Sequence, residues 1–158
     1  MRLRAWRFVT LTLAALSMGM AWAHALELGP KMALPAPDYI LVQGIYQEFG
    51  RLGAVIEPAA ILAAAILTFL ARRRQPAFRY SLAGAVFLAA AFVVWIAFVM
   101  PANAELAVWD ATSAPADWQR IRDQWEYAHL ARFLLQLAGF CALLISVLVE
   151  TPGDEAAA

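Results

Sequence analysis

Polar and aromatic residues between positions 115 and 149 recur at the spacing of an α-helix. The steps between them alternate between four and three residues, which aligns one stripe of side chains along a single long helix: Trp118, Arg122, Trp125, His129, Arg132 and Gln136. Residues 130–149 are otherwise almost wholly apolar and are long enough to cross a bilayer core of about 30 Å. Because ionisable groups are costly inside a bilayer, this stripe should face other helices or a cavity, and it is a candidate functional site.

His129 is the strongest candidate for acid–base chemistry, because an imidazole exchanges protons near neutral pH. Glu126 precedes it by three residues on the same face and is expected to orient the ring. The structural alternative is a histidine that serves only as a hydrogen-bonded packing group. Trp118 and Trp125 share this face, so they are suited to sandwich a flat aromatic ligand, although indole rings also anchor helices at the membrane interface.

Polar residues of the other hydrophobic segments should reach the same end of the protein. They belong to the first segment, to the second, and to the chain just after the third: His24 and Glu27, Glu57, and Asn103. Glu57 lies five residues inside its segment, and a carboxylate at that depth needs a partner. Arg132 is the obvious one, so the sequence leaves open whether this ion pair is structural or catalytic.

A metal site is the second chemical interpretation. His24 and Glu27 are three residues apart, as are Glu126 and His129. Di-iron four-helix proteins use a similar set of two histidines and several carboxylates. The match is incomplete, because the order of the two ligands is reversed in the first segment and the third segment has a carboxylate only beyond its end. We therefore predict a site without a metal.

The composition places the chain in a membrane. Hydrophobic residues make up 63% of it, charged residues only 15%, and the mean hydropathy is +0.65, which lies outside the range of soluble proteins. Four apolar segments reach spanning length: residues 8–26, 52–71, 80–100 and 130–149. We predict an all-α, four-helix transmembrane bundle that forms one multi-pass domain over residues 1–158, in the cell (inner) membrane. Cys141 is the only cysteine, which excludes an intrachain disulfide.

The charges predict how the bundle lies in the membrane. Seven of the twelve basic residues fall in two short segments: Arg2, Arg4, Arg7, Arg72, Arg73, Arg74 and Arg79. By the positive-inside bias both segments, and both termini, should be cytoplasmic, and the polar site should lie at the outer face. The arginines at 72–74 are therefore interpreted as a topology signal. The lipid bilayer is the predicted partner, and nucleic acid is not.

The first segment allows two interpretations. Its basic start, apolar middle and small residues near position 25 are typical of a cleaved secretory signal, and cleavage would leave three spans. The apolar run is, however, longer than a usual signal core, and it leads directly into a polar face with helical spacing: His24, Glu27 and Lys31. This continuity favours a retained first helix.

A short helix is predicted between the first two spans. Four residues should end any helix before it: Gly29, Pro30, Pro35 and Pro37. Asp38 can then cap a short helix that ends at Gly50 and carries an apolar stripe: Val42, Ile45, Tyr46 and Phe49. This helix either lies along the membrane surface or forms a lid that places Tyr39 or Tyr46 over a cavity.

Several of these motifs, taken together, resemble the anthrone-oxygenase-like integral membrane family. They are Pro101-Ala102-Asn103, Trp109, Pro115-Ala116-Asp117-Trp118, and Arg122-x-x-Trp125-Glu126-x-x-His129-x-x-Arg132. The resemblance implies a small four-helix membrane protein. Some relatives oxidise anthrones to anthraquinones with molecular oxygen and no evident cofactor.

The chemistry implied by the resemblance suits the residues. His129 would remove the acidic ring-methylene proton of a lipophilic aromatic substrate, leaving a carbanion that can itself reduce oxygen. Asn103 and Arg122 would hold phenolate oxygens, and Trp125 would stack on the rings. The rival hypothesis is a non-catalytic membrane module, either a partner subunit or a small-ligand binder, in which the same residues only tie helices together. The oligomeric state is left open.

Overall fold

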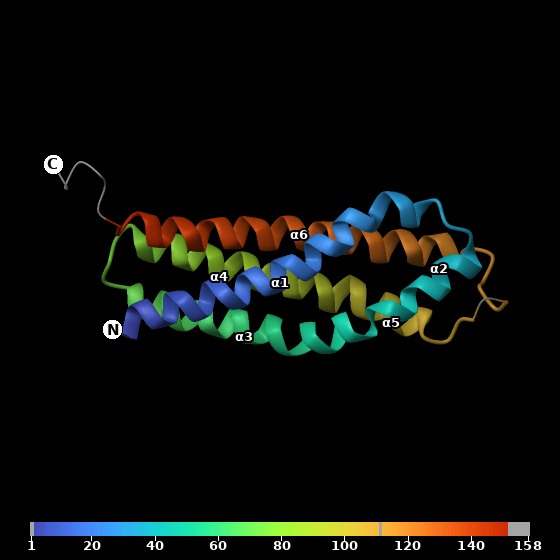
Figure 1. Cartoon of the computed structure of the whole chain (residues 1–158), viewed down its shortest axis with the longest axis horizontal. Helices are drawn as coiled ribbons and strands as arrows, with labels where there is room; N and C mark the ends of the chain where they lie inside the picture. Colours follow the sequence, from blue (N-terminus) through green and yellow to red (C-terminus); the bar gives the residue numbers. More distant parts are fainter. Residues whose placement is uncertain (1, 111, 152–158) are drawn as a thin grey trace.

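The computed structural model describes residues 2–110 and 112–151, and this part of the chain is all-helical. Four long helices run side by side along the molecule (Figure 1): α1 (Arg2–Met32), α3 (Gln47–Ala71), α4 (Ala77–Val94) and α6 (Trp118–Leu148). Shorter elements connect or extend them: α2 (Ala36–Gln43), η1 (Gly44–Tyr46), η2 (Trp95–Val99) and α5 (Met100–Leu106). The predicted all-α four-helix fold is confirmed.

The helices have the length and surface of membrane spans. All four are long and apolar enough to cross a bilayer. At 1.5 Å per residue, α1 and α6 are each about 45 Å long, so their ends extend beyond a hydrocarbon core of about 30 Å. Large apolar side chains cover the outward faces of the bundle, as expected for contact with lipid: Phe8, Leu16, Leu62, Phe69 and Val93.

The start of α1 and the end of α6 lie at the same end of the bundle (Figure 1). Arg7 of α1 forms an ion pair with Glu150, and Arg74 lies 3.7 Å from the same carboxylate. We call the opposite end, formed by α2, α5 and the first turns of α6, the distal end. That the distal end faces the outside of the membrane stays a prediction from the arginine distribution.

Three predicted helix boundaries are corrected. α1 continues through Pro30 to Met32, where Lys31 is held by buried contacts that are described below. Pro35 and Pro37 begin α2 instead of ending a helix, because the first turn needs no proline N–H. The predicted end at Gly50 is wrong, since α3 runs through this residue and the break in the helix falls earlier, at η1.

The segment formed by α2 and η1 packs on the bundle as a lid. Tyr39 is fully buried and Tyr46 is 8% exposed, whereas Leu41 and Ile45 point away from the bundle. Val42 and Phe49 pack with Tyr46 against α6, so Ile45 is the one member of the predicted apolar stripe that does not. The lid interpretation is therefore confirmed, with both tyrosines turned inward.

α6 is one continuous helix, as the stripe of polar residues predicts, and it begins at Trp118 after Asp117. The third span is less regular, because five residues of it form the π-helical turn η2. Such turns in α-helices are often found at functional sites. No sequence pattern predicts η2, and its first residue, Trp95, faces a cavity that is described below.

The buried face of α1 carries polar residues along its length. Thr10, Ser17, His24 and Lys31 follow one another at seven-residue steps, and all four are buried. This spacing returns each side chain to nearly the same face of the helix, and α1 packs against α3 and α6. α1 is thus built as part of the bundle, and its retention in the cell stays a prediction.

The close approach of α4 and α6 gives a testable prediction about stability. A Cβ atom on Gly84 would lie 2.6 Å from Cγ of Leu143 and 3.1 Å from the carbonyl oxygen of Gly139. Gly84→Ala should therefore lower the free energy of unfolding by about 1–3 kcal/mol, the usual cost of overpacking a core, measured by chemical unfolding in detergent. Gly19→Ala is the matched control, because a Cβ there meets nothing within 4 Å. Equal stability of the two variants would contradict this packing.

Candidate functional site

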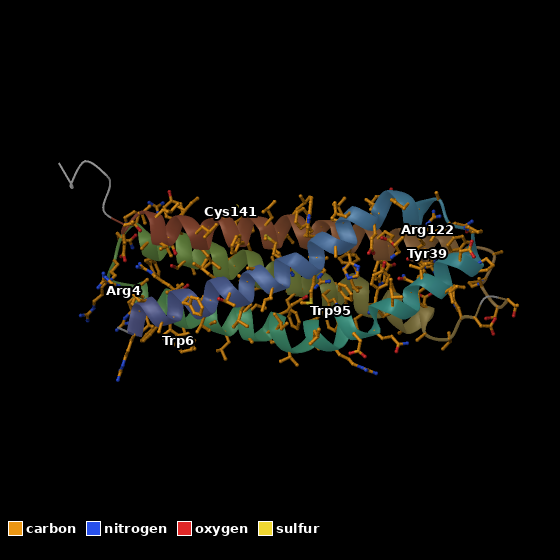
Figure 2. The ribbon with its side chains drawn as sticks, in the orientation of Figure 1. Arg4, Trp6, Tyr39, Trp95, Arg122 and Cys141 are labelled. Atoms are coloured by element: carbon orange, nitrogen blue, oxygen red, sulfur yellow. The ribbon has the colours of Figure 1, made fainter. Side chains whose placement is uncertain are left out.

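A small chamber lies inside the distal half of the bundle and has a volume of about 70 Å³. Every long helix contributes to its wall. The residues that line it and bear on the chemistry are His24, Tyr46, Phe49, Gly50, Gly53, Glu57, Phe92, Trp95, Asn103, Trp125, His129 and Arg132. In Figure 2, Trp95 lies farther from the distal end than Tyr39 and Arg122 do. Because His24, Glu57, Asn103 and His129 all line this chamber, their predicted convergence is found.

Two histidines face each other across the α1–α6 contact. The ring centroids of His24 and His129 are 4.2 Å apart with the planes tilted by 45°, and both residues are buried. Nη1 of Arg132 lies 3.1 Å from Nδ1 of His129. Because a guanidinium can only donate, Nδ1 must accept, and the neutral ring then carries its proton on Nε2. Nδ1 of His24 has no hydrogen-bond partner among the described residues.

Arg132 also forms the predicted ion pair with Glu57. The two side chains are bonded to each other and are both buried, so each neutralises a charge that would be costly alone in a low-dielectric interior. Both residues line the chamber. The pair therefore has a structural role, and it also supplies the cation that fixes the tautomer of His129.

An aromatic wall closes the chamber on one side. The ring of Trp125 lies 4.0 Å from that of His129 and 5.1 Å from that of His24, and Tyr46 lies 4.8 Å from His24. Nε1 of Trp125 donates a hydrogen bond of 2.7 Å to Oδ1 of Asn103. Since an indole can only donate, the carbonyl of Asn103 is identified by this bond, and its amide N–H₂ group is left to donate elsewhere.

A second polar cluster, the Lys31 cluster, joins the lid to α1 and α6. Nζ of Lys31 lies 2.6 Å from Oε1 of Glu126, and the hydroxyl of Tyr39 donates to the same oxygen at 3.1 Å. Gln43 donates to the Tyr39 hydroxyl at 2.7 Å. Nζ of Lys31 also lies 4.0 Å from the centroid of the Trp125 ring, within the range of a cation–π contact.

The Lys31 cluster corrects the expected role of Glu126. No hydrogen bond joins Glu126 to His129 among the described residues, because the carboxylate turns toward Lys31 and Tyr39. Glu27, expected beside His24, accepts a hydrogen bond from the Tyr46 hydroxyl instead. Both carboxylates therefore hold neighbouring helices and the lid around the chamber, and the ring of His129 is positioned by Arg132.

Trp118 and Arg122 do not reach the chamber. Nη1 of Arg122 donates to the carbonyl oxygen of Met32 at 3.0 Å, its guanidinium lies 5.1 Å from the Trp118 ring, and Trp118 packs against Tyr39. Seven residues separate Arg122 from His129, which is about 10 Å along a helix. Neither residue lines the chamber that contains His129, so their part in substrate binding stays a prediction.

The metal interpretation gains no support from the side-chain arrangement. Over residues 2–110 and 112–151, no group of three or more His, Cys, Asp or Glu side chains is close enough to hold a metal ion. Each carboxylate that was a candidate ligand is bonded to another side chain: Glu57 to Arg132, Glu126 to Lys31 and Glu27 to Tyr46.

A larger open groove adjoins the chamber and was not expected from the sequence. Its volume is about 700 Å³. It is lined by the lid, the start of α3, η2, α5 and α6, through Ile40, Gln43, Gly44, Tyr46, Gln47, Gly50, Arg51, Ala54, Trp95, Asn103, Leu106, Ala107, Trp109 and Trp125. Only a few of these residues belong to motifs that are recognisable in the sequence. Gly50 and Gly53, two turns and one turn before Glu57, were a signal that could have indicated open space on this face of α3.

The fold and the site define a class: an all-helical protein with four membrane-capable helices and a buried histidine, arginine and carboxylate chamber. The sequence profile of the anthrone oxygenase family matches residues 48–142. This match covers more than half of the chain, and the chain belongs to the anthrone oxygenase family. It includes Glu57, Asn103, Trp125, His129 and Arg132, whereas His24 lies before it. No curated protein and no solved structure matches the chain.

Proposed function

We propose that this protein is a membrane oxygenase that converts an acidic ring methylene of a lipophilic aromatic compound into a ketone, using molecular oxygen and no cofactor. Family membership supports the class of reaction. The observation that carries the proposal is the histidine pair, in which the two rings lie 4.2 Å apart beside a buried arginine. Such a site supplies a proton acceptor and hydrogen-bond donors in a space that holds little water. All three features favour the formation of a carbanion.

The hydrogen bonds distinguish the roles of the two histidines. His129 was the base expected from the sequence, but its Nδ1 lone pair is occupied by Arg132 and its Nε2 carries a proton. His24 has an unpartnered Nδ1 among the described residues, so it is free to accept a proton. We therefore assign His24 as the base. His129 becomes a donor that stabilises the oxyanion of the deprotonated substrate.

Asn103 is the second donor to that oxyanion. Its carbonyl is occupied by Trp125, so the amide N–H₂ group is available to the enolate or phenolate oxygen. Asn103 lines both the chamber and the groove, which places it where a substrate would pass from one to the other. Two fixed donors at this position would stabilise charge as it develops and lower the barrier to proton removal.

The proposed reaction balances without an external reductant. His24 takes one methylene proton, and the carbanion gives one electron to O₂, forming superoxide and a carbon radical. These combine into a C–O bond, and the resulting peroxide takes a proton to become a hydroperoxide. Loss of the second C–H proton then forms the C=O bond as the O–O bond breaks, and water leaves. The substrate is oxidised, and O₂ supplies one oxygen atom to the ketone and one to water.

Oxygen uptake by the purified protein tests the proposal. With a simple anthrone in detergent or liposomes, we expect uptake of one O₂ for each anthraquinone formed, above the spontaneous rate. Use of ¹⁸O₂ should place the label in the new carbonyl group. Absence of uptake with anthrones and with several other acidic aromatic methylenes would favour the rival hypothesis of a non-catalytic membrane module.

A further inference from the structure

The volumes of the two cavities constrain where a substrate can lie. The chamber, at about 70 Å³, has room for a few water molecules and is well below the range of about 300–1,000 Å³ that is typical of small-molecule sites. The groove, at about 700 Å³, falls within this range. A compound of several fused rings therefore cannot lie wholly beside the histidines, whereas the groove can hold it.

The groove and the chamber share one wall. Six residues line both: Tyr46, Gly50, Ala54, Trp95, Asn103 and Trp125. Trp125 is fixed there by its hydrogen bond to Asn103 and by its contact with Lys31. The six residues thus form the boundary between the groove and the chamber that holds the histidine pair.

We propose that the groove is the binding site for a flat compound of several aromatic rings, and that only its reacting edge enters the chamber, where O₂ meets it. This inference rests on the proposed function and deepens it. It names a two-part site, with recognition in the groove and chemistry in the chamber.

The lining of the groove favours an aromatic occupant over a lipid acyl chain. Three indole rings line it, those of Trp95, Trp109 and Trp125, and indoles stack favourably on flat ring systems. Its polar residues are Gln43, Gln47, Arg51 and Asn103, which can donate to phenol and ketone oxygens. An acyl chain offers no acceptor for these groups, so their desolvation would disfavour it.

The glycines of this region allow each part of the site to be blocked separately. Gly44 lines only the groove, Gly53 only the chamber, and Gly50 both, whereas Gly29 lines neither. A Cβ atom on Gly29, Gly44 or Gly50 meets nothing within 4 Å, and one on Gly53 meets only Oε1 of Glu57 at 3.5 Å. Leucine at each position can therefore enter the adjoining space without a steric clash at its Cβ.

The experiment measures binding and turnover in four variants of the full-length protein. Binding is followed by quenching of tryptophan fluorescence with dihydroxyanthraquinone, a product-like probe that does not react. Gly44→Leu and Gly50→Leu should weaken binding by about tenfold or more. Gly53→Leu should bind the probe within about twofold of wild type yet lose most of the oxygen uptake with an anthrone. Gly29→Leu should match wild type in both measurements.

Binding of the probe tests the groove, and oxygen uptake tests the oxygenase, so the failure of one proposal can be distinguished from the failure of the other. If wild type binds the probe and Gly50→Leu does not, but wild type shows no oxygen uptake, the groove proposal is supported and the oxygenase proposal is overturned. Oxygen uptake and probe binding that are unchanged in both Gly44→Leu and Gly50→Leu would overturn the groove and leave the oxygenase standing. A third result would also overturn the assignment. If phospholipid co-purifies with wild type but not with Gly50→Leu, and the probe does not displace it, a lipid occupies the groove.

Discussion

Replacing His24 by alanine should lower the rate of oxygen uptake by about 10²- to 10⁴-fold, the usual contribution of a general base. The expected loss is large because Nδ1 of His24 is buried and no donor occupies it among the described residues, whereas Nδ1 of His129 accepts from Arg132. With a substrate deuterated at the methylene, the residual rate should show a larger isotope effect than in wild type, since proton removal becomes fully rate-limiting.

Chemical rescue separates a base from a packing group. Free imidazole should restore part of the activity of His24→Ala, because the ring that is removed leaves space beside the chamber. The comparison variant is His129→Ala, which is expected to lose about 10²- to 10³-fold through the missing oxyanion donor. Equal activity of His24→Ala and wild type would remove His24 from the mechanism.

Replacing Arg132 by methionine should destabilise the protein by about 3–5 kcal/mol, the usual cost of leaving one member of a buried ion pair without its partner. Glu57 would then be buried with no cation beside it, since Arg132 is the basic residue to which it is paired. The measurement is the free energy of unfolding in detergent. Oxygen uptake should fall as well, because Nδ1 of His129 would lose its donor and the ring its fixed tautomer.

Two comparisons identify the cause of that destabilisation. The double variant Glu57→Leu/Arg132→Met should recover much of the lost stability, because replacing a buried pair by apolar residues removes both desolvation costs. Arg51→Met is the matched surface control: its partner Glu48 and Arg51 itself are 69% and 71% exposed, so the change should stay within about 1 kcal/mol. A double variant no more stable than Arg132→Met would refute the ion-pair explanation.

The fold and half of the site could be predicted from the sequence for physical reasons. Only helices satisfy every backbone polar group within a bilayer, apart from closed barrels, so four apolar segments of spanning length are sufficient to predict a helical bundle. A buried charge in such a bundle needs a partner of opposite charge, because burying it alone is costly. This requirement predicted Arg132 as the partner of Glu57. The helical spacing within α6 placed Trp125, His129 and Arg132 on one inner face.

The remainder of the site depends on how one helix is rotated against another, which local spacing does not encode. Glu126 could have turned toward His129 or toward another helix, and Lys31, at the end of α1, decides the matter. Arg122 shares the stripe of His129, but it lies too far along α6 and bonds to the end of α1. The groove depends on the lid and on η2, and neither the inward turn of Tyr46 nor the π-helical turn leaves a periodic signal in the sequence.

The Lys31–Glu126 contact joins α1 to α6, two helices that lie far apart in the sequence. Until α6 has been inserted, Lys31 and Glu57 lie in the nascent chain without Glu126 and Arg132, their partners in the finished bundle. A chain that stops before α6 therefore retains these two charges without their partners and only His24 of the histidine pair. Both ion pairs and the histidine pair are thus completed only when α6 packs into the bundle.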